Sequence, residues 1–99
     1  MTLAELKAVL ANGFRPPVEV VGIETLIYRL RLRLGQKLVW IEDETGASLV
    51  FPSSTAACRA LWDLGLRKAT LVTDGYWDAE VGGGSDPGLR HSLSFTERP

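Results

Sequence analysis

The sequence predicts an α+β fold in which two helices pack on one face of an antiparallel β-sheet. Residues 26–34 alternate strictly between apolar and mostly basic side chains, which is typical of a strand with one buried face. Gly35-Gln36 follows as a two-residue hairpin loop. Apolar residues at helical spacing occur over 2–12 and 54–64, on either side of the strand-like segments.

Length and composition predict one small cytoplasmic domain. The chain has 99 residues, which is enough for one domain and too few for two. A formal net charge of −1 gives the whole molecule no attraction to nucleic acid or to anionic lipid. No apolar run reaches membrane-spanning length, and the N-terminal segment lacks the pattern of a signal peptide. The single cysteine, Cys58, has no disulfide partner and fits a reducing compartment.

The first helix is expected over 2–12, because Thr2 and Glu5 form a Thr-x-x-Glu capping box. Two consecutive prolines then make an extended connector, since each lacks a backbone donor and disfavours helix before it. The first strand is predicted over 18–23, with Gly22 as a candidate bulge.

The hairpin of residues 26–42 organises the rest of the prediction. A glycine at the first loop position suits a type II′ turn, which sets the register of the two strands. In that register Arg31 lies opposite Trp40, and Arg29 lies opposite Glu42. A slip by one residue would bury the basic side chains, so the register should be firm. The expected apolar face consists of Leu26, Tyr28, Leu30, Leu32 and Leu34, and the opposite face of Ile27, Arg29, Arg31 and Arg33.

The order of elements predicted along the whole chain is α-β-β-β-β-α-β. An acidic turn containing glycine is expected to return the chain from the hairpin as a strand over 47–51. A serine-capped helix over 54–64 and a last strand over 68–73 follow. We expect that last strand to lie beside the first strand and antiparallel to it. The four consecutive strands thus form a meander, with the fifth strand at its edge.

The domain is expected to occupy residues 1–81, and residues 82–99 are expected to form a flexible tail rich in glycine and serine. A weak alternation at Leu89, His91 and Leu93 leaves open a tail strand that docks on the sheet.

The arginine-bearing side of the hairpin is the most distinctive feature of the sequence. It is either a solvated face whose arginine stems cover apolar surface, or a surface that binds an anion, an acidic segment or single-stranded nucleic acid. A third possibility is that the acidic segment 74–86, with its two aromatic residues, folds over the arginines of its own chain or of a neighbour. The candidate binding residues are Arg29, Arg31, Arg33, Trp40, Tyr76 and Trp77.

Nothing in the sequence indicates catalysis, and we expect no enzyme activity, no metal and no cofactor. The chain lacks the common phosphate-binding, nucleophile and zinc-protease motifs. The only histidine, His91, lies in the expected tail, where no scaffold would orient it. Cys58 lies among small apolar residues of a helix, which favours a packing role.

The order of helix, strand pair, acidic turn and serine-capped helix continues into Leu71-Val72 and then Tyr76-Trp77-Asp78-Ala79-Glu80. This arrangement resembles a small family of uncharacterised bacterial proteins over about residues 1–82 of this chain. Trp77 interrupts the Tyr-Asp spacing of that family. The resemblance implies a small cytoplasmic bacterial protein, and it implies no catalytic residue.

These features predict a non-enzymatic protein-interaction module. Arginine combined with aromatic side chains is typical of interface centres, so the partner is expected to be an acidic protein segment, or a second copy that meets the Arg/Trp face. The alternative is a single-stranded nucleic-acid or anionic-ligand site that uses Arg29, Arg31, Arg33 and Trp40. The net charge and the acidic turns argue against nucleic acid, and no membrane partner is expected.

Overall fold

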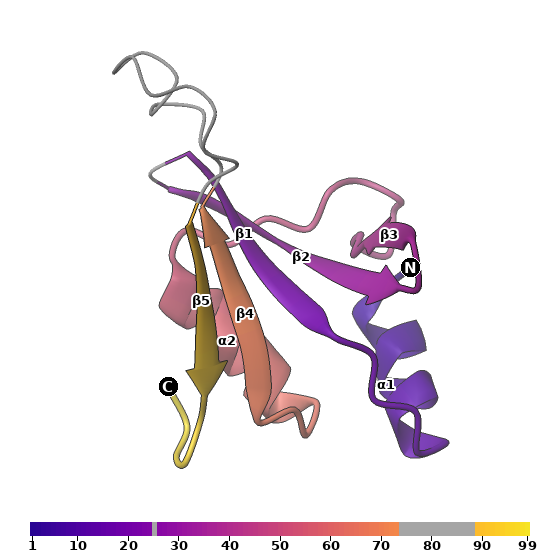
Figure 1. The fold of residues 1–99 in the computed structure, drawn as a ribbon. Helices are drawn as coiled ribbons and strands as arrows, with labels where there is room; N and C mark the ends of the chain where they lie inside the picture. Colours follow the sequence, from indigo (N-terminus) through magenta and orange to yellow (C-terminus); the bar gives the residue numbers. More distant parts are fainter. Residues whose placement is uncertain (25, 74–88) are drawn as a thin grey trace.

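The computed structural model describes residues 1–24, 26–73 and 89–99, and it confirms the α+β class. Five strands form one sheet in the order β3-β2-β1-β4-β5, and both helices lie on the same face of it (Figure 1). None of the described helices covers the other face. The elements are α1 (Leu3–Ala11), β1 (Val18–Glu24), β2 (Ile27–Leu34), β3 (Lys37–Trp40), α2 (Ser54–Asp63), β4 (Lys68–Thr73) and β5 (Leu89–Ser94).

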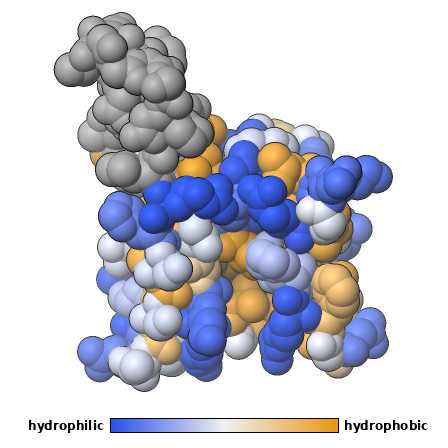
Figure 2. Space-filling model, in the orientation of Figure 1, coloured by the Kyte–Doolittle hydropathy of each residue, from blue (hydrophilic) through white to orange (hydrophobic). Residues whose placement is uncertain are grey.

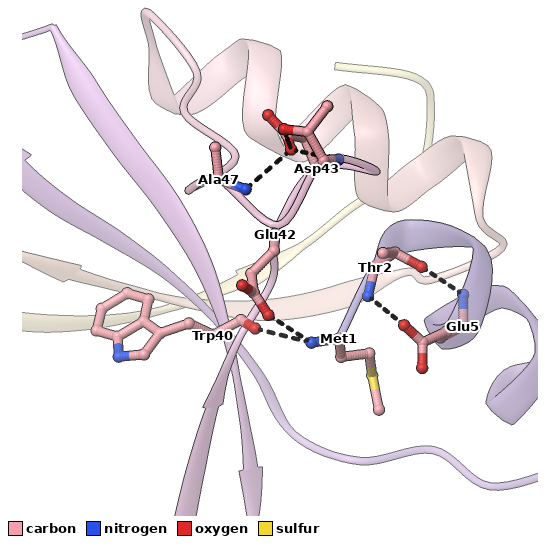
Figure 3. Close-up of polar contacts among 8 residues, drawn as sticks. Met1, Thr2, Glu5, Trp40, Glu42, Asp43 and Ala47 are labelled. Carbon is pink, nitrogen blue, oxygen red and sulfur yellow. Dashed lines mark hydrogen bonds and ion pairs between the residues drawn. The ribbon is translucent and has the colours of Figure 1, made fainter.

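The helix α1 begins as predicted, with a capping box. The Thr2 hydroxyl accepts a hydrogen bond from the Glu5 backbone N–H at 3.2 Å, and the Glu5 carboxylate accepts one from the Thr2 N–H at 3.1 Å (Figure 3). The Met1 nitrogen lies 3.2 Å from the Glu42 carboxylate, which joins the start of α1 to the end of β3. Glu42 therefore does not form the expected pair with Arg29.

The hairpin of β2 and β3 has the predicted register. Gly35 has φ +64°, as the first position of a type II′ turn requires. Arg31 lies opposite Trp40, and every second residue of β2 points into the core. Leu30 and Leu32 are completely buried, whereas Leu26 precedes β2 and is exposed, contrary to the prediction.

The expected strand over 47–51 is wrong. The Ile41 N–H donates to the Leu30 carbonyl at 3.0 Å, so the chain is still paired with β2 there. Further along the same edge of β2, Phe51 and Tyr28 exchange two backbone hydrogen bonds of 2.8 and 3.0 Å. Phe51 therefore continues the line of β3 and does not reverse it.

The intervening residues 42–50 form a loop that is held by the Asp43 side chain and by backbone hydrogen bonds, among them one of 2.8 Å from the Asp43 N–H to the Ala47 carbonyl. The Asp43 carboxylate accepts hydrogen bonds from the Thr45 and Ala47 backbone N–H groups at 2.8 and 3.0 Å. Figure 3 shows the Ala47 contact. Gly46 has φ +87°, a conformation that favours glycine. The acidic turn and its glycine were correctly located, but they close a loop rather than a hairpin of two long strands.

Because residues 47–51 do not reverse the chain, β4 runs in the direction opposite to the predicted one. The predicted neighbour of β1 is correct, because residues 19–22 of β1 pair with residues 70–73 of β4. The two strands are parallel, however, because the chain reverses once fewer before α2 than the predicted order requires. The sheet is therefore mixed, and the observed order is α-β-β-β-α-β-β.

The C-terminal residues join the sheet. The strand β5 pairs antiparallel with β4 along its whole length. The C-terminal strand that the weak alternation allowed as an alternative is therefore present. The Phe95 N–H donates to the Arg67 carbonyl at 2.9 Å, and Phe95 packs against the core. Residues 89–99 thus belong to the domain rather than to a flexible tail, whereas the expected boundary at residue 81 lies outside the described residues.

The hydrophobic core lies between the helices and the sheet. It is built mainly from alternate residues of β1 and β2, from two leucines of α1 and from one face of α2. The completely buried core side chains, which have no solvent exposure, are Leu6, Val20, Leu30, Leu32, Ile41, Ala57 and Leu61.

The aromatic ring of Tyr28 in β2 lies over Gly22 of β1. Gly22 is the cross-strand partner of Tyr28, and a Cβ atom at Gly22 would lie 3.0 Å from Tyr28 Cε1. The pairing register shifts between Gly22 and Glu24, which confirms the expected bulge. We expect Gly22→Ala to lower the free energy of unfolding by about 1–3 kcal/mol, because the added Cβ would push on the Tyr28 ring, and Tyr28 packs against the hydrophobic core, which resists its displacement.

A double-mutant cycle in urea checks this contact. If the ring is the cause, Gly22→Ala should be much less damaging when Tyr28→Ala is already present. An equal loss in both backgrounds would show that the glycine is needed for another reason.

Candidate functional site

The uncovered face of the sheet gathers a cluster of charged and aromatic side chains. The pairing register places Glu19 of β1 beside Arg31 of β2, and it places Arg90 of β5 on the same face. The predicted hairpin residues lie here as expected. We call this surface the arginine face, and its members are Glu19, Arg29, Arg31, Arg33, Trp40 and Arg90.

Glu19 is the centre of the arginine face. Its side chain is only 2% exposed, and Arg31 Nε donates to its Oε1 at 2.6 Å. Arg33 Nη2 donates to Oε2 at 3.2 Å, and Arg90 donates to the same oxygen. Burial by itself would raise the pKa of Glu19, but the hydrogen bonds from the arginines outweigh it and lower the pKa to about 2. The carboxylate therefore stays ionised and holds three guanidinium groups in place.

This geometry predicts a loss of stability in acid. A carboxyl group with a pKa of about 2 in the folded state and 4.5 in its ordinary state stabilises the fold fully above pH 5. That contribution, roughly 3 kcal/mol, is lost progressively as the pH falls from about 5 to about 2. Urea unfolding at several pH values measures it. The Glu19→Gln variant should show a flatter pH profile over this interval, and equal profiles would contradict the assignment.

Trp40 positions two of the arginines without neutralising them. The guanidinium carbons of Arg29 and Arg31 lie 4.3 and 5.1 Å from the centre of the Trp40 ring. Such cation–π contacts fix the guanidinium planes and leave their charge intact. Figure 3 shows the Trp40 ring pointing away from α1. Within the described residues, the buried Nε of Arg29 has no hydrogen-bond partner.

The arginine face therefore carries an excess of positive charge. Among the described residues this surface holds four arginines and one carboxylate, a formal charge of +3, and three of the four arginines donate to that carboxylate. In Figure 2 a band of hydrophilic residues crosses this side of the molecule. Val21 and Val72 lie opposite Arg29 and Arg90, and they are only 5% and 7% exposed although neither belongs to the core cluster. The arginine stems are long enough to shield them.

The structure brings together four of the six residues proposed from the sequence, namely Arg29, Arg31, Arg33 and Trp40. Tyr76 and Trp77 lie outside the described residues, as does the segment 74–86 that was considered as a cover for the arginines.

Sequence reasoning missed Glu19 and Arg90. The sequence did contain a signal for Glu19. It is a charged residue that stands between Val18 and Val20 in an apolar strand, so its side chain must point to the face opposite to theirs. Arg90 had none, because its position depends on where β5 pairs.

Cys58 and His91, the two other polar candidates from the sequence, do not belong to the arginine face. Cys58 is buried in the core, and burial raises the pKa of its thiol, so it packs as an apolar residue. His91 is exposed on the edge strand β5. Over residues 1–24, 26–73 and 89–99, no three potential metal ligands lie together. In the same part of the chain, every helix is too short or too polar to cross a bilayer.

Comparisons of the chain with protein-family models, with curated proteins and with solved structures find no match. The resemblance to a family of bacterial proteins therefore stays a prediction. The chemistry of the arginine face is what supports a function.

Proposed function

We propose that the chain is a non-enzymatic interaction module that binds an acidic protein segment through the arginine face. The observation that carries this proposal is the imbalance of charge around Glu19, where three guanidinium groups converge on one carboxylate. The arrangement is already formed before any partner arrives, because Glu19 is buried and the Trp40 ring packs against Arg29 and Arg31. Preorganised donors lose little conformational entropy on binding.

The arginine N–H groups on this surface that do not bind Glu19 can donate hydrogen bonds to carboxylates of a partner. Arg33 and Arg90 each use one nitrogen on Glu19, and their side chains are 43% and 50% exposed. A guanidinium has five N–H donors, so both retain donors for a partner. Arg29 has no acidic partner among the described residues. Each of these groups can take a carboxylate through two parallel hydrogen bonds.

A second copy of the chain is a poor partner for this surface. In a two-fold dimer the same patch meets itself, so arginine would face arginine. Charge of one sign on both sides of a contact costs free energy and slows association. The charge therefore favours an acidic partner over a homodimer through the Arg/Trp face.

Single-stranded nucleic acid is the alternative, since phosphate also accepts bidentate arginine contacts. Base stacking, however, needs an open aromatic ring. Two guanidinium groups already lie over the Trp40 ring, which leaves less of it for a base. The acidic protein segment is thus the better supported of the two.

Fluorescence anisotropy with a labelled decaglutamate peptide tests the proposal. We expect salt-sensitive, saturable binding that weakens about tenfold or more in the Arg29→Gln/Arg33→Gln variant, because each lost charged hydrogen bond costs about 1.5–3 kcal/mol. The control Lys7→Gln/Arg59→Gln removes the same charge from exposed positions on the two helices, and it should bind like the parent chain.

Three outcomes would count against the proposal. The first is the absence of saturable binding at low salt. The second is equal weakening in the control variant, which would indicate a response to net charge alone. The third is tighter binding of a labelled ten-nucleotide oligothymidylate than of the peptide, which would favour the nucleic-acid alternative.

A further inference from the structure

A groove opens where β1 and β4 separate. The parallel pairing of the two strands begins only at Glu19 and Thr70, and toward their N-terminal ends the strands draw apart (Figure 1). Pro16 and Pro17 precede β1 and lack backbone donors, so the ladder cannot extend in that direction. The result is an open groove with a cavity volume of about 750 Å³.

The lining of the groove combines apolar and cationic residues. Val18, Leu66 and Ala69 line it, and all three are core residues, so its floor is the exposed edge of the hydrophobic core. Arg15 and Lys68 also line it, and both are exposed. The third cation of the lining, Arg67, is committed elsewhere, because it donates to the Trp62 and Leu66 carbonyls. No acidic residue is among those that line the groove.

The cations Arg15 and Lys68 are available for a ligand. Within the parts of the chain that the structure describes, neither side chain has a hydrogen-bond or ion-pair partner. Thr70, Ser92 and Ser94 are further polar residues of the lining. Ligand sites of this size usually combine an apolar wall with a few convergent polar groups.

We propose that this groove binds a small organic anion, with an apolar ring against the Val18–Ala69 side and a phosphate or carboxylate between Arg15 and Lys68. The site differs from the arginine face in its residues and in its ligand. The arginine face offers a charged surface without an apolar cavity, whereas the groove offers both in one place. Each site can therefore exist without the other.

Phenyl phosphate is the probe that tests the groove. Its binding is measured by the chemical-shift changes of the backbone amides of the ¹⁵N-labelled protein. We expect saturable shifts at Val18, Leu66 and Ala69. Inorganic phosphate has the charge without the ring, and benzyl alcohol has the ring without the charge, so both should bind about tenfold or more weakly.

The Arg15→Gln/Lys68→Gln variant should weaken phenyl phosphate binding by about tenfold or more, while Lys7→Gln/Lys37→Gln should not change it. All four positions are exposed, so the variants should keep the parent melting temperature. Lack of saturable shifts would overturn the proposal. So would shifts confined to Arg31, Arg33 and Arg90, or binding that is unchanged in the Arg15→Gln/Lys68→Gln variant. None of these results would refute binding of an acidic peptide to the arginine face.

Discussion

Replacing Glu19 with glutamine is expected to lower the free energy of unfolding by about 3–5 kcal/mol, which is the usual cost of removing one partner from a buried ion pair. The side chain is 2% exposed and is the shared acceptor of Arg31, Arg33 and Arg90. Without the carboxylate, three guanidinium groups would remain close together with no anion to screen them. Glutamine keeps the shape of the side chain, so the loss reports the charge.

Urea unfolding at pH 7 measures this loss, and Asp63→Asn provides the matched control. Asp63 also accepts an arginine, because Arg98 Nε lies 3.1 Å from its Oδ1, but this pair is exposed to solvent. Exposed pairs contribute little, so the control should change the urea midpoint only slightly. Equal, small losses in both variants would mean that Glu19 does not hold the arginines together.

Replacing Leu32 with alanine is expected to cost about 2–5 kcal/mol, the range for deleting a buried leucine side chain. Leu32 lies on the core side of β2 and has no solvent exposure. The matched control is Leu38→Ala in β3. Leu38 lies opposite Arg33 on the uncovered side and is 44% exposed, so its replacement should change stability by about 0.5 kcal/mol or less.

This pair of leucines tests the two faces of the hairpin. Both belong to the same β-ribbon, and they differ in the face to which they point. Comparable losses from the two substitutions, measured by urea unfolding, would contradict the assignment of the core to one face.

The sequence was sufficient for several features that depend on local chemistry. The capping box of α1, the Gly35 turn and the alternation of β2 are each determined by residues a few positions apart. The hairpin register followed from the turn, and with it the contact between Arg31 and Trp40. Three arginines of the candidate site were therefore located correctly on one face.

The features that depend on distant pairing could not be obtained this way. Residues 47–51 alternate like a strand, but Ile41 is held in the core and Phe51 returns to the edge of β2 beside Tyr28. The residues next to this segment in the sequence do not reveal that Phe51 will pair with β2 rather than with a strand before it. The same limit explains the direction of β4 and the position of Arg90, which reaches Glu19 only because β5 pairs with β4.

The central claim is that the arginine face is preformed around Glu19 and still holds cations for an acidic partner. The most direct measurement is the ¹H–¹⁵N spectrum of the arginine Nε–H groups while decaglutamate is added. We expect a separate, slowly exchanging Arg31 signal before any peptide is present, because its Nε donates to a buried carboxylate. Signals of Arg29, Arg33 and Arg90 should then shift saturably. An Arg31 signal that coincides with those of exposed arginines, or shifts confined to arginines outside the arginine face, such as Arg59 and Arg98, would contradict the account.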